Sequence, residues 1–261
     1  MPEGHTVHRI AKDHQRLLRG QPLILLSPQG RFSEEAKRLT GKKLLDIEAH
    51  GKHLFYRWPN QQYLHVHLGL YGKFRVHSNP APEPRGAVRV RMIGTRNSVD
   101  LNGPNQCEIL SVQQYQHIKQ RLGLDPLGED QDIEPTWERI SSSRAAIGSL
   151  LLDQSIIAGI GNIYRAELLF LTRIHPERMG KQITRAEFET LWKLTQELMG
   201  IGVIQNRIVT VVKTKTNIEP LRRIRNRFWI YKNPECPRCH SDVYYWEMAG
   251  RTMYACDQCQ L

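Results

Sequence analysis

Four cysteines near the end of the chain limit most strongly what it can fold into. They form two Cys-x-x-Cys pairs, Cys236 with Cys239 and Cys256 with Cys259, separated by sixteen residues. Two such turns, brought together by a hairpin, present four thiolates in the tetrahedron that zinc accepts. A disulfide framework is the alternative, but it would spread cysteines more evenly through a small secreted chain. The spacing predicts one structural Zn²⁺, because four protein ligands leave no open catalytic position.

The residues between the two pairs have the pattern of a β-hairpin. We expect strands over Asp242–Glu247 and Thr252–Ala255, joined by a turn at Ala249–Gly250. Arg251 then lies at or directly after the turn, where a guanidinium suits a phosphate. The unit 228–261 is too short to hold a core alone, so its folding should depend on the metal.

The chain is strongly basic, with 37 lysines and arginines against 26 aspartates and glutamates and a net charge of +11. Seven basic residues and one acidic residue fall within 207–227. Such a run is most often a solvated face. Here it lies between two motifs that suit phosphates, which favours a nucleic-acid surface.

Membrane and secreted proteins are disfavoured. No apolar run approaches the roughly 20 residues that a membrane span needs, and residues 1–20 lack the apolar stretch of a secretory signal. Paired cysteines without a signal fit a reducing compartment. We expect a cytoplasmic protein with no membrane partner, and Cys107 as an ordinary buried thiol.

The apolar pattern changes along the chain. Residues 1–20 have the spacing of an amphipathic helix, and a β-rich region follows from about residue 23 to 113. The Gly- and Pro-containing Leu122–Gly128 marks a domain boundary. Within the β-rich region we expect strands such as Leu44–Ala49, His53–Trp58, Tyr63–Leu68, Lys73–His77 and Ala87–Met92. After the boundary we expect helices over Ser143–Ser155, Ile163–Leu171 and Thr184–Met199. The last of these begins with a capping box and ends at Gly200–Ile204, and Val203–Thr216 is a loop or a strand.

Residues 157–164 lie between two expected helices and contain Gly159 and Gly161, which permit a tight turn with close backbone approach. Asn162 is a good N-cap for the next helix. The N–H groups at that helix N-terminus would suit a phosphate. An ordinary turn between two helices fits the residues equally well.

The N-terminal residues can supply a nucleophile and a general acid or base. Removal of Met1 would leave Pro2 with a free secondary amine, which attacks a carbonyl-like carbon to form an iminium. The reference pKa of a terminal amine is about 8, so an appreciable part is neutral near neutral pH. Glu3 can carry protons as a general acid or base. Lys52, directly after a glycine, is a phosphate contact or simply a surface lysine.

These motifs occur together, in this order, in one family. The chain resembles the bacterial formamidopyrimidine-DNA glycosylase / endonuclease VIII family of base-excision repair over essentially its whole length. The resemblance rests on Pro2-Glu3-Gly4, Gly51-Lys52, His67–Gly72 (HLGLYG), Leu122–Leu127, Ala158–Tyr164, Ile174–Arg178, Gly250–Thr252 and the four cysteines.

The resemblance implies an α+β fold of several domains. An N-terminal catalytic β-sandwich with flanking helices would span 1–121, a linker 122–135, a helix-two-turn-helix DNA-binding domain 136–227 and a zinc-finger β-hairpin 228–261. It also implies a monomer that acts on damaged double-stranded DNA, with bubble or single-stranded DNA as further partners.

The resemblance also implies a bifunctional glycosylase and AP lyase. Pro2 would attack C1′ of the damaged nucleotide as the Schiff-base nucleophile, and Glu3 would donate a proton. β- and δ-elimination would then nick the strand. Lys52, Asn162 and Arg251 would hold the flanking phosphates, and Lys52 would also donate a proton.

Extruding a damaged base leaves a gap in the stack, and an apolar wedge can fill such a gap. Leu70 and Tyr71 look like that wedge, because the HLGLYG loop resembles the endonuclease VIII loop more than the formamidopyrimidine loop. A core residue and its neighbour on a hairpin are the alternative.

The chain departs from the family pattern in two places. His5-Thr6 replaces the frequent Pro-Glu, so we assign no second carboxylate. Asp100–Pro104 stands where the formamidopyrimidine branch has an Arg-Phe-Gly loop. We therefore expect an endonuclease VIII of the actinobacterial type, which prefers oxidised pyrimidines to 8-oxoguanine.

Other functions remain open on these residues: a catalytically inactive damaged-DNA-binding protein, an oxidised-purine glycosylase, or a zinc-ribbon nuclease using Mg²⁺, for which we see no carboxylate cluster. His65 and His67 lie on one face of a strand. A second metal site there is an alternative to the structural role that we favour.

Overall fold

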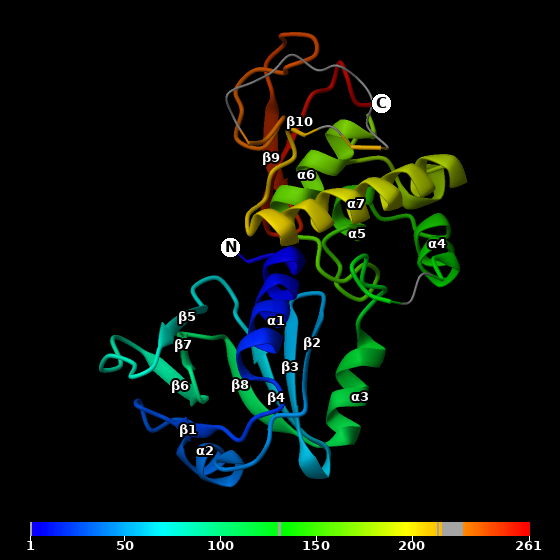
Figure 1. Cartoon of the computed structure of the whole chain (residues 1–261). Coiled ribbons are helices and arrows are strands. Elements are labelled where there is room, and N and C mark those ends of the chain that lie inside the picture. Colours follow the sequence, from blue (N-terminus) through cyan, green and yellow to red (C-terminus); the bar gives the residue numbers. More distant parts are fainter. Residues whose placement is uncertain (1, 130–131, 213, 216–226) are drawn as a thin grey trace. The chain divides into compact units, whose positions relative to one another are not determined.

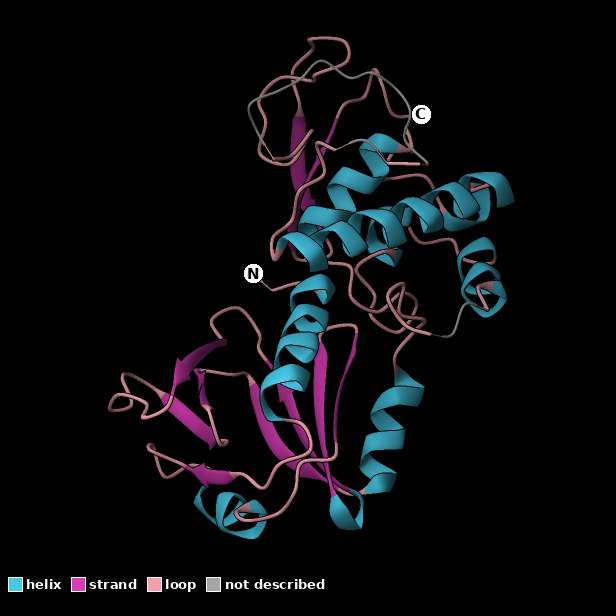
Figure 2. Ribbon diagram, in the orientation of Figure 1, coloured by secondary structure: helices cyan, strands magenta, loops and turns pink. Residues whose placement is uncertain are grey.

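The computed structural model describes residues 2–129, 132–212, 214–215 and 227–261 (Figure 1). The chain forms two compact units. The first contains Pro2 and Val7–Arg121, and the second contains Glu3–Thr6 and Leu122–Leu261. Strands dominate the first unit, and helices dominate the second (Figure 2). The predicted α+β class is confirmed.

The first unit is a β-sandwich of two antiparallel four-stranded sheets. Their strand orders are β1-β6-β7-β5 and β2-β3-β4-β8. The elements are α1 (Gly4–Leu18), which begins in the residues grouped with the second unit, β1 (Ile24–Leu26), α2 (Ser33–Leu39), β2 (Asp46–His50), β3 (His53–Trp58), η1 (Pro59–Gln61), β4 (Gln62–His67), β5 (Lys73–Ser78), β6 (Val88–Ile93), β7 (Asn97–Asn102), β8 (Gln106–Leu110) and α3 (Val112–Arg121).

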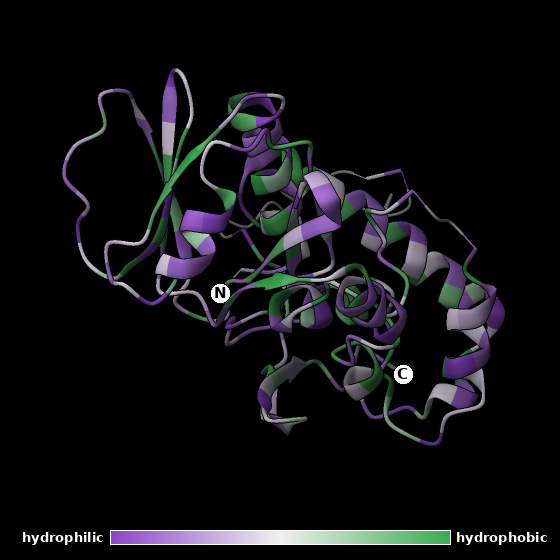
Figure 3. Ribbon diagram, turned by 90° about the horizontal axis from the view of Figure 1, so that it is seen from below, coloured by the Kyte–Doolittle hydropathy of each residue, from purple (hydrophilic) through white to green (hydrophobic). Residues whose placement is uncertain are grey.

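The apolar residues of this unit share one core. Val7, Ala11 and Leu18, on one side of α1, are buried together with sheet residues such as Leu54 and Val90. The amphipathic spacing of α1 and the alternation in the strands therefore describe two sides of the same core. In Figure 3, hydrophobic and hydrophilic residues alternate along the helices and strands, while many connecting loops are hydrophilic.

Several elements of this unit differ from those expected from the sequence. β1, β7 and β8 lie within the expected β-rich region without having been named, whereas the helices α2 and α3 are not predicted by the sequence pattern. No residue of α3 is fully buried. This helix contacts the second sheet through Tyr115, which stacks on Tyr63 with ring centroids 4.1 Å apart, and through Lys119, whose Nζ lies 3.7 Å from Oε1 of Glu48.

The second unit is mainly helical. Its elements are α4 (Glu134–Ser141), α5 (Ile147–Leu150), α6 (Asn162–Leu171), η2 (Gly180–Gln182), α7 (Arg185–Gln205), β9 (Tyr244–Met248) and β10 (Arg251–Ala255). Within the described ranges, no helix is both long and apolar enough to cross a membrane. The hairpin of β9 and β10 turns at Ala249–Gly250, so the predicted hairpin is confirmed.

Two helix predictions in this unit are wrong. The expected helix Ser143–Ser155 shrinks to α5, because the Ile147 and Gly148 N–H groups donate to the carbonyls of Arg178 and Pro176. The helix expected over Thr184–Met199, α7, starts at the predicted capping box but continues past Gly200 to Gln205, and its C-cap is Asn206 with a φ of 53°. In the first case tertiary hydrogen bonds override the local helix signal, and in the second the glycines at 200 and 202 do not stop the helix.

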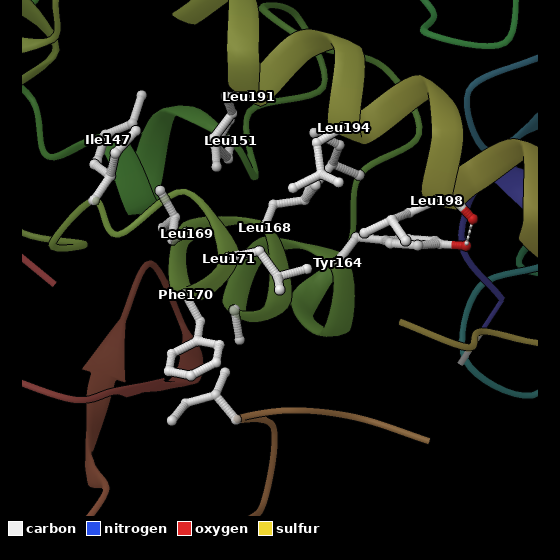
Figure 4. Close-up of a cluster of buried hydrophobic side chains, with 14 of the residues drawn as sticks. Ile147, Leu151, Tyr164, Leu168, Leu169, Phe170, Leu171, Leu191, Leu194 and Leu198 are labelled. Atoms are coloured by element: carbon white, nitrogen blue, oxygen red, sulfur yellow. Dashed lines mark hydrogen bonds between the residues drawn. The ribbon is translucent and has the colours of Figure 1, made fainter. Parts of the chain in front are cut away.

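Helix α6 is the centre of the second core. Nearly all of its residues are buried, and they contact α5 and α7 (Figure 4). Tyr164 Oη donates to the carbonyl of Leu198 at 3.2 Å. Gly202 makes room for this hydroxyl, because a Cβ there would lie 2.3 Å from Tyr164 Oη. The first turn of α6 is thereby held in a fixed position.

Candidate active site and zinc centre

The carboxylate of Glu3 lies at the N-terminus of α6 and is fully buried. Its Oε2 accepts from the N–H of Gly161 at 2.8 Å and of Tyr164 at 3.4 Å, and its Oε1 accepts from Ile163 N–H at 3.0 Å. The N-cap is Gly161, and Asn162 is the first helical residue. The predictions that Asn162 caps the helix and that these N–H groups are open to a phosphate are therefore wrong.

Two glycines give Glu3 its position. A Cβ on Gly161 would lie 2.4 Å from Cδ of Glu3, so any side chain there displaces the carboxylate. The N–H of Gly4 donates to the carbonyl of Gly159 at 2.9 Å, which ties the start of the chain to the same turn. The glycines of residues 157–164 thus serve the Glu3 carboxylate.

Asn162 and Arg251 lie close together in the second unit. Nδ2 of Asn162 donates to the carbonyl of Thr252 at 2.9 Å, which joins α6 to β10. Arg251 is the first residue of β10 and is exposed. Its guanidinium has no hydrogen bond or ion pair within the residues that the structure describes. It is therefore available to an anion.

Lys52, Leu70 and Tyr71 belong to the first unit. His53 pairs with His67 across β3 and β4, so the turn containing Lys52 and the turn after β4 leave the sheet at the same end. Leu70 is 47% exposed and Tyr71 is 85% exposed. A core position for these two side chains is excluded. Pro2 is half-buried and directly precedes Glu3 in the chain.

The two strand histidines belong to a buried polar cluster. His65 uses both ring nitrogens, one with Nδ1 of His53 at 2.9 Å and the other with Oε1 of Glu108 at 3.1 Å. Burial lowers the pKa of His53 to about 3 and also lowers the pKa values of His65 and His67. Both ring nitrogens of His65 already have hydrogen-bond partners, and among the described residues only the four cysteines group as metal ligands, so the structural role is favoured over a second metal site.

The four cysteines of the hairpin come together as predicted. Their Sγ atoms all lie within 4.8 Å of one another, and the Cys236–Cys259 and Cys239–Cys256 separations are 3.8 and 3.5 Å. A tetrahedron with Zn–S bonds of about 2.3 Å has edges of about 3.8 Å. The thiols therefore fit a zinc ion.

The thiols also differ in how readily they lose a proton. A hydrogen bond from Ser241 lowers the pKa of Cys239 to about 6, whereas burial raises the pKa of Cys236. A cation among them favours the thiolate form of all four, so metal binding should release protons.

The predicted basic surface over 207–227 lies mostly outside the described residues. Arg207, Lys215 and Arg227 belong to the described part of the chain.

Comparison with known proteins decides the family. Residues 1–105 match the model of the formamidopyrimidine-DNA glycosylase N-terminal domain, and residues 122–213 match its H2TH domain. Endonuclease 8 1 of Mycobacterium tuberculosis is 41% identical over 267 residues, covering 100% of both chains. The chain belongs to the formamidopyrimidine-DNA glycosylase / endonuclease VIII family.

Two further members of the family are less similar to this chain. Formamidopyrimidine-DNA glycosylase of Thermomicrobium roseum is 29% identical, covering 91% of this chain and 87% of the relative. A solved complex of Lactococcus lactis Fpg with abasic-site DNA has a TM-score of 0.81 and 25% identity, and covers 99% of both chains. Higher identity to an endonuclease 8 agrees with the predicted branch. As a family member, the chain is a DNA glycosylase of base-excision repair.

Sequence reasoning missed two buried charges of this glycosylase, Arg165 and Glu167 on α6. Glu167 accepts hydrogen bonds from the N–H groups of Trp229, Ile230 and Tyr231 and from Thr210 Oγ1. It thereby fixes the segment that enters the zinc hairpin. The signal was available, because two charges inside an apolar helix must have partners.

Proposed function

We propose that the protein is a bifunctional DNA glycosylase and AP lyase that removes oxidised pyrimidines. The observation that carries this proposal is the position of Glu3. Three backbone N–H groups hold its carboxylate in a buried site, and the residue directly before it is Pro2. An acid fixed beside an N-terminal amine is the arrangement that base displacement with Schiff-base formation needs.

The reaction begins once Met1 has been removed. The lone pair of the Pro2 nitrogen forms a bond to C1′, and the C1′–base bond breaks with its electron pair leaving on the base. Glu3 accepts the proton that the Pro2 nitrogen loses on bonding to C1′ and donates it to O4′, so that the C1′–O4′ bond can break. Opening of the sugar ring gives the iminium, whose positive charge acidifies the C2′ proton. Loss of that proton expels the 3′ phosphate, a second elimination expels the 5′ phosphate, and water releases the enzyme.

The same proposal assigns the DNA contacts. Lys52 binds a phosphate and transfers a proton, and Asn162 and Arg251 bind phosphates beside the lesion. The exposed Leu70 and Tyr71 fill the gap that the extruded nucleotide leaves in the duplex. Phosphate contacts fix the register of the protein on DNA but do not select the lesion.

We assign each of these roles to a separate part of the chain. We assign catalysis to residues 1–121, a linker to 122–135, DNA binding to 136–227 and the zinc hairpin to 228–261. One zinc ion on the four cysteines holds the hairpin that presents Arg251. We propose that the protein acts as a monomer in the bacterial cytoplasm, where its DNA lies and its thiols stay reduced. Its partner is damaged duplex DNA, together with bubble or single-stranded DNA.

Incision of matched duplexes tests the proposed activity and substrate. Duplexes carrying dihydrouracil, thymine glycol or 8-oxoguanine are compared under single-turnover conditions. We expect faster cleavage of the two pyrimidine lesions, with phosphate at both new ends from β,δ-elimination. Faster cleavage at 8-oxoguanine would overturn the pyrimidine preference. Binding without cleavage of any lesion would favour an inactive damage-binding protein.

A further inference from the structure

Arg165 lies one turn after Asn162 on α6 and is 0% exposed. Its Nη2 donates to Oδ1 of Asn162 at 2.6 Å, and its Nη1 donates to the carbonyl of Met248 at 3.1 Å. Longer hydrogen bonds reach the carbonyls of Gly148 at 3.4 Å and Arg251 at 3.5 Å. One guanidinium therefore joins α5, α6 and both strands of the hairpin.

The two hairpin carbonyls flank the turn that presents Arg251. Met248 ends β9 and Arg251 begins β10, and the turn residues Ala249 and Gly250 have φ values of 53° and 68°. Both turn residues are in the left-handed region, so the turn benefits from being held on each side. The planar fork of an arginine can reach both carbonyls at once, which a lysine ammonium cannot do with the same geometry.

Arg165 also decides which way the amide of Asn162 points. An amide oxygen accepts and an amide nitrogen donates twice. Oδ1 accepts a hydrogen bond from Arg165, and one N–H of Nδ2 donates to the carbonyl of Thr252. Within the described part of the chain the second N–H has no partner, so it can meet an anion. An apolar side chain at position 165 would remove the hydrogen bond that sets the orientation of the Asn162 amide, and the amide could then rotate.

The charge on Arg165 costs free energy to bury, which makes a purely space-filling role a poor explanation. Burial lowers its pKa to about 10, while Glu3 raises it, so the group stays charged at neutral pH. Its hydrogen-bond partners are backbone carbonyls and an amide. Each of the closest partners belongs to the Asn162 side chain or the Arg251 turn.

We propose that Arg165 is a positioning residue, which orients Asn162 and fixes the turn that carries Arg251 so that both meet DNA phosphates in one geometry. This inference rests on the proposed function, which assigns those two residues to phosphates. Arg165 is buried and acts only through them.

The test compares Arg165→Met, Arg165→Lys, Arg251→Met and the double variant Arg165→Met/Arg251→Met. The affinity for a duplex with a tetrahydrofuran abasic analogue is measured over a series of NaCl concentrations. Arg251→Met should lower the slope of log K against log salt by about 0.9, the value for one lost phosphate contact. Arg165→Met should lower it equally, and the double variant no further, because both changes remove the same contact.

Arg165→Lys separates geometry from charge. It keeps the cation but lacks the fork, so we expect it to show the same reduced slope as Arg165→Met. A wild-type slope for Arg165→Lys would show that charge alone is sufficient, and would overturn the proposal. If Arg165→Met does not fold, Arg165→Lys replaces it in the double variant, which should again show no lower salt slope than Arg251→Met alone.

Arg238→Met is the matched control. Arg238 donates to the carbonyls of Phe170 and Leu171 at 2.5 and 3.2 Å, so it serves the other end of α6. We expect it to lower the melting temperature, as Arg165→Met does, but to keep the wild-type salt slope. Bound zinc is measured in every variant, so that loss of the ion is not mistaken for loss of positioning.

The outcomes separate this inference from the proposed function. An unchanged slope in Arg251→Met would refute the phosphate role of Arg251 and, with it, the proposed DNA contact. A reduced slope in Arg251→Met together with a wild-type slope in Arg165→Met would overturn only the positioning role. A double variant whose salt slope falls by twice as much as that of either single variant would also overturn the positioning role, because it would show two independent phosphate contacts.

Discussion

The N–H of Gly161 donates to Oε2 of Glu3 at 2.8 Å, although the two residues are 158 positions apart in sequence. This contact places the proposed proton donor at the first turn of α6. It also explains why a glycine is needed at position 161, where a Cβ would lie 2.4 Å from Cδ of Glu3. The acid is therefore positioned by a residue that has no chemistry of its own.

Gly161→Ala should disable the enzyme without altering any reactive group. The φ of Gly161 is −121°, which alanine adopts readily, so the change acts by displacing the Glu3 carboxylate. We expect single-turnover base excision to fall by about 100-fold, within the range for loss of a general acid. Gly200→Ala is the control, because a Cβ there meets nothing within 4 Å. Similar rates for Gly161→Ala and wild type would refute the role of this contact.

Leu70→Ala and Tyr71→Ala test the wedge. Both side chains are exposed, so truncation should leave the melting temperature unchanged. Filling the gap matters only where bases are stacked, so excision from a duplex should fall, while excision from a single strand should change little. Val76→Ala, at a 48% exposed position of β5, is the control. Equal losses on duplex and single-stranded substrates would contradict the wedge.

Removal of zinc should weaken DNA binding. Cys236→Ser loses one of four ligands, so the hairpin that presents Arg251 should lose its fixed structure. We expect less than one zinc per chain by elemental analysis and a weaker affinity for abasic-analogue DNA. Cys107→Ser should retain the metal, because Cys107 lies in the first unit. Full zinc content in Cys236→Ser would exclude the four-cysteine site.

The first unit should lose stability in acid. Burial lowers the pKa values of His14 and His53 to about 4 and about 3, from about 6.5 when unfolded. Between these values the unfolded state binds more protons, so the free energy of unfolding falls as pH falls below about 6.5. Each histidine contributes up to about 1.4 kcal/mol per pH unit. Urea unfolding from pH 7 to 5 measures this slope.

His14→Gln should flatten that dependence, because it removes one of the histidines whose pKa burial lowers. His8→Gln is the matched control, since His8 lies half-buried on the same helix. An identical slope in His14→Gln and wild type would show that His14 does not link stability to protons.

Local sequence patterns predicted the elements whose structure depends on neighbouring residues. The cysteine spacing predicted the zinc hairpin, and the capping box at Thr184 predicted the start of α7. Prediction was wrong where distant contacts dominate. The region 143–155 has good helix formers, yet backbone bonds to Pro176 and Arg178 break the helix.

The candidate site shows the same limit. The motif residues could be named from the sequence, but their partners could not. Nothing local indicates that Glu3 occupies the N–H groups of α6, or that Arg165 links Asn162 to the hairpin. These contacts join segments that are far apart in the chain, so only the folded structure reveals them.

Borohydride trapping tests the central claim most directly. Protein is incubated with a duplex that carries dihydrouracil, reduced with sodium borohydride, digested and analysed by mass spectrometry. We predict a covalent DNA adduct on an N-terminal peptide that begins at Pro2, and a sharp loss of this adduct in Pro2→Gly. An adduct on a lysine such as Lys52, or cleavage of the strand with no adduct at all, would contradict the proposed chemistry.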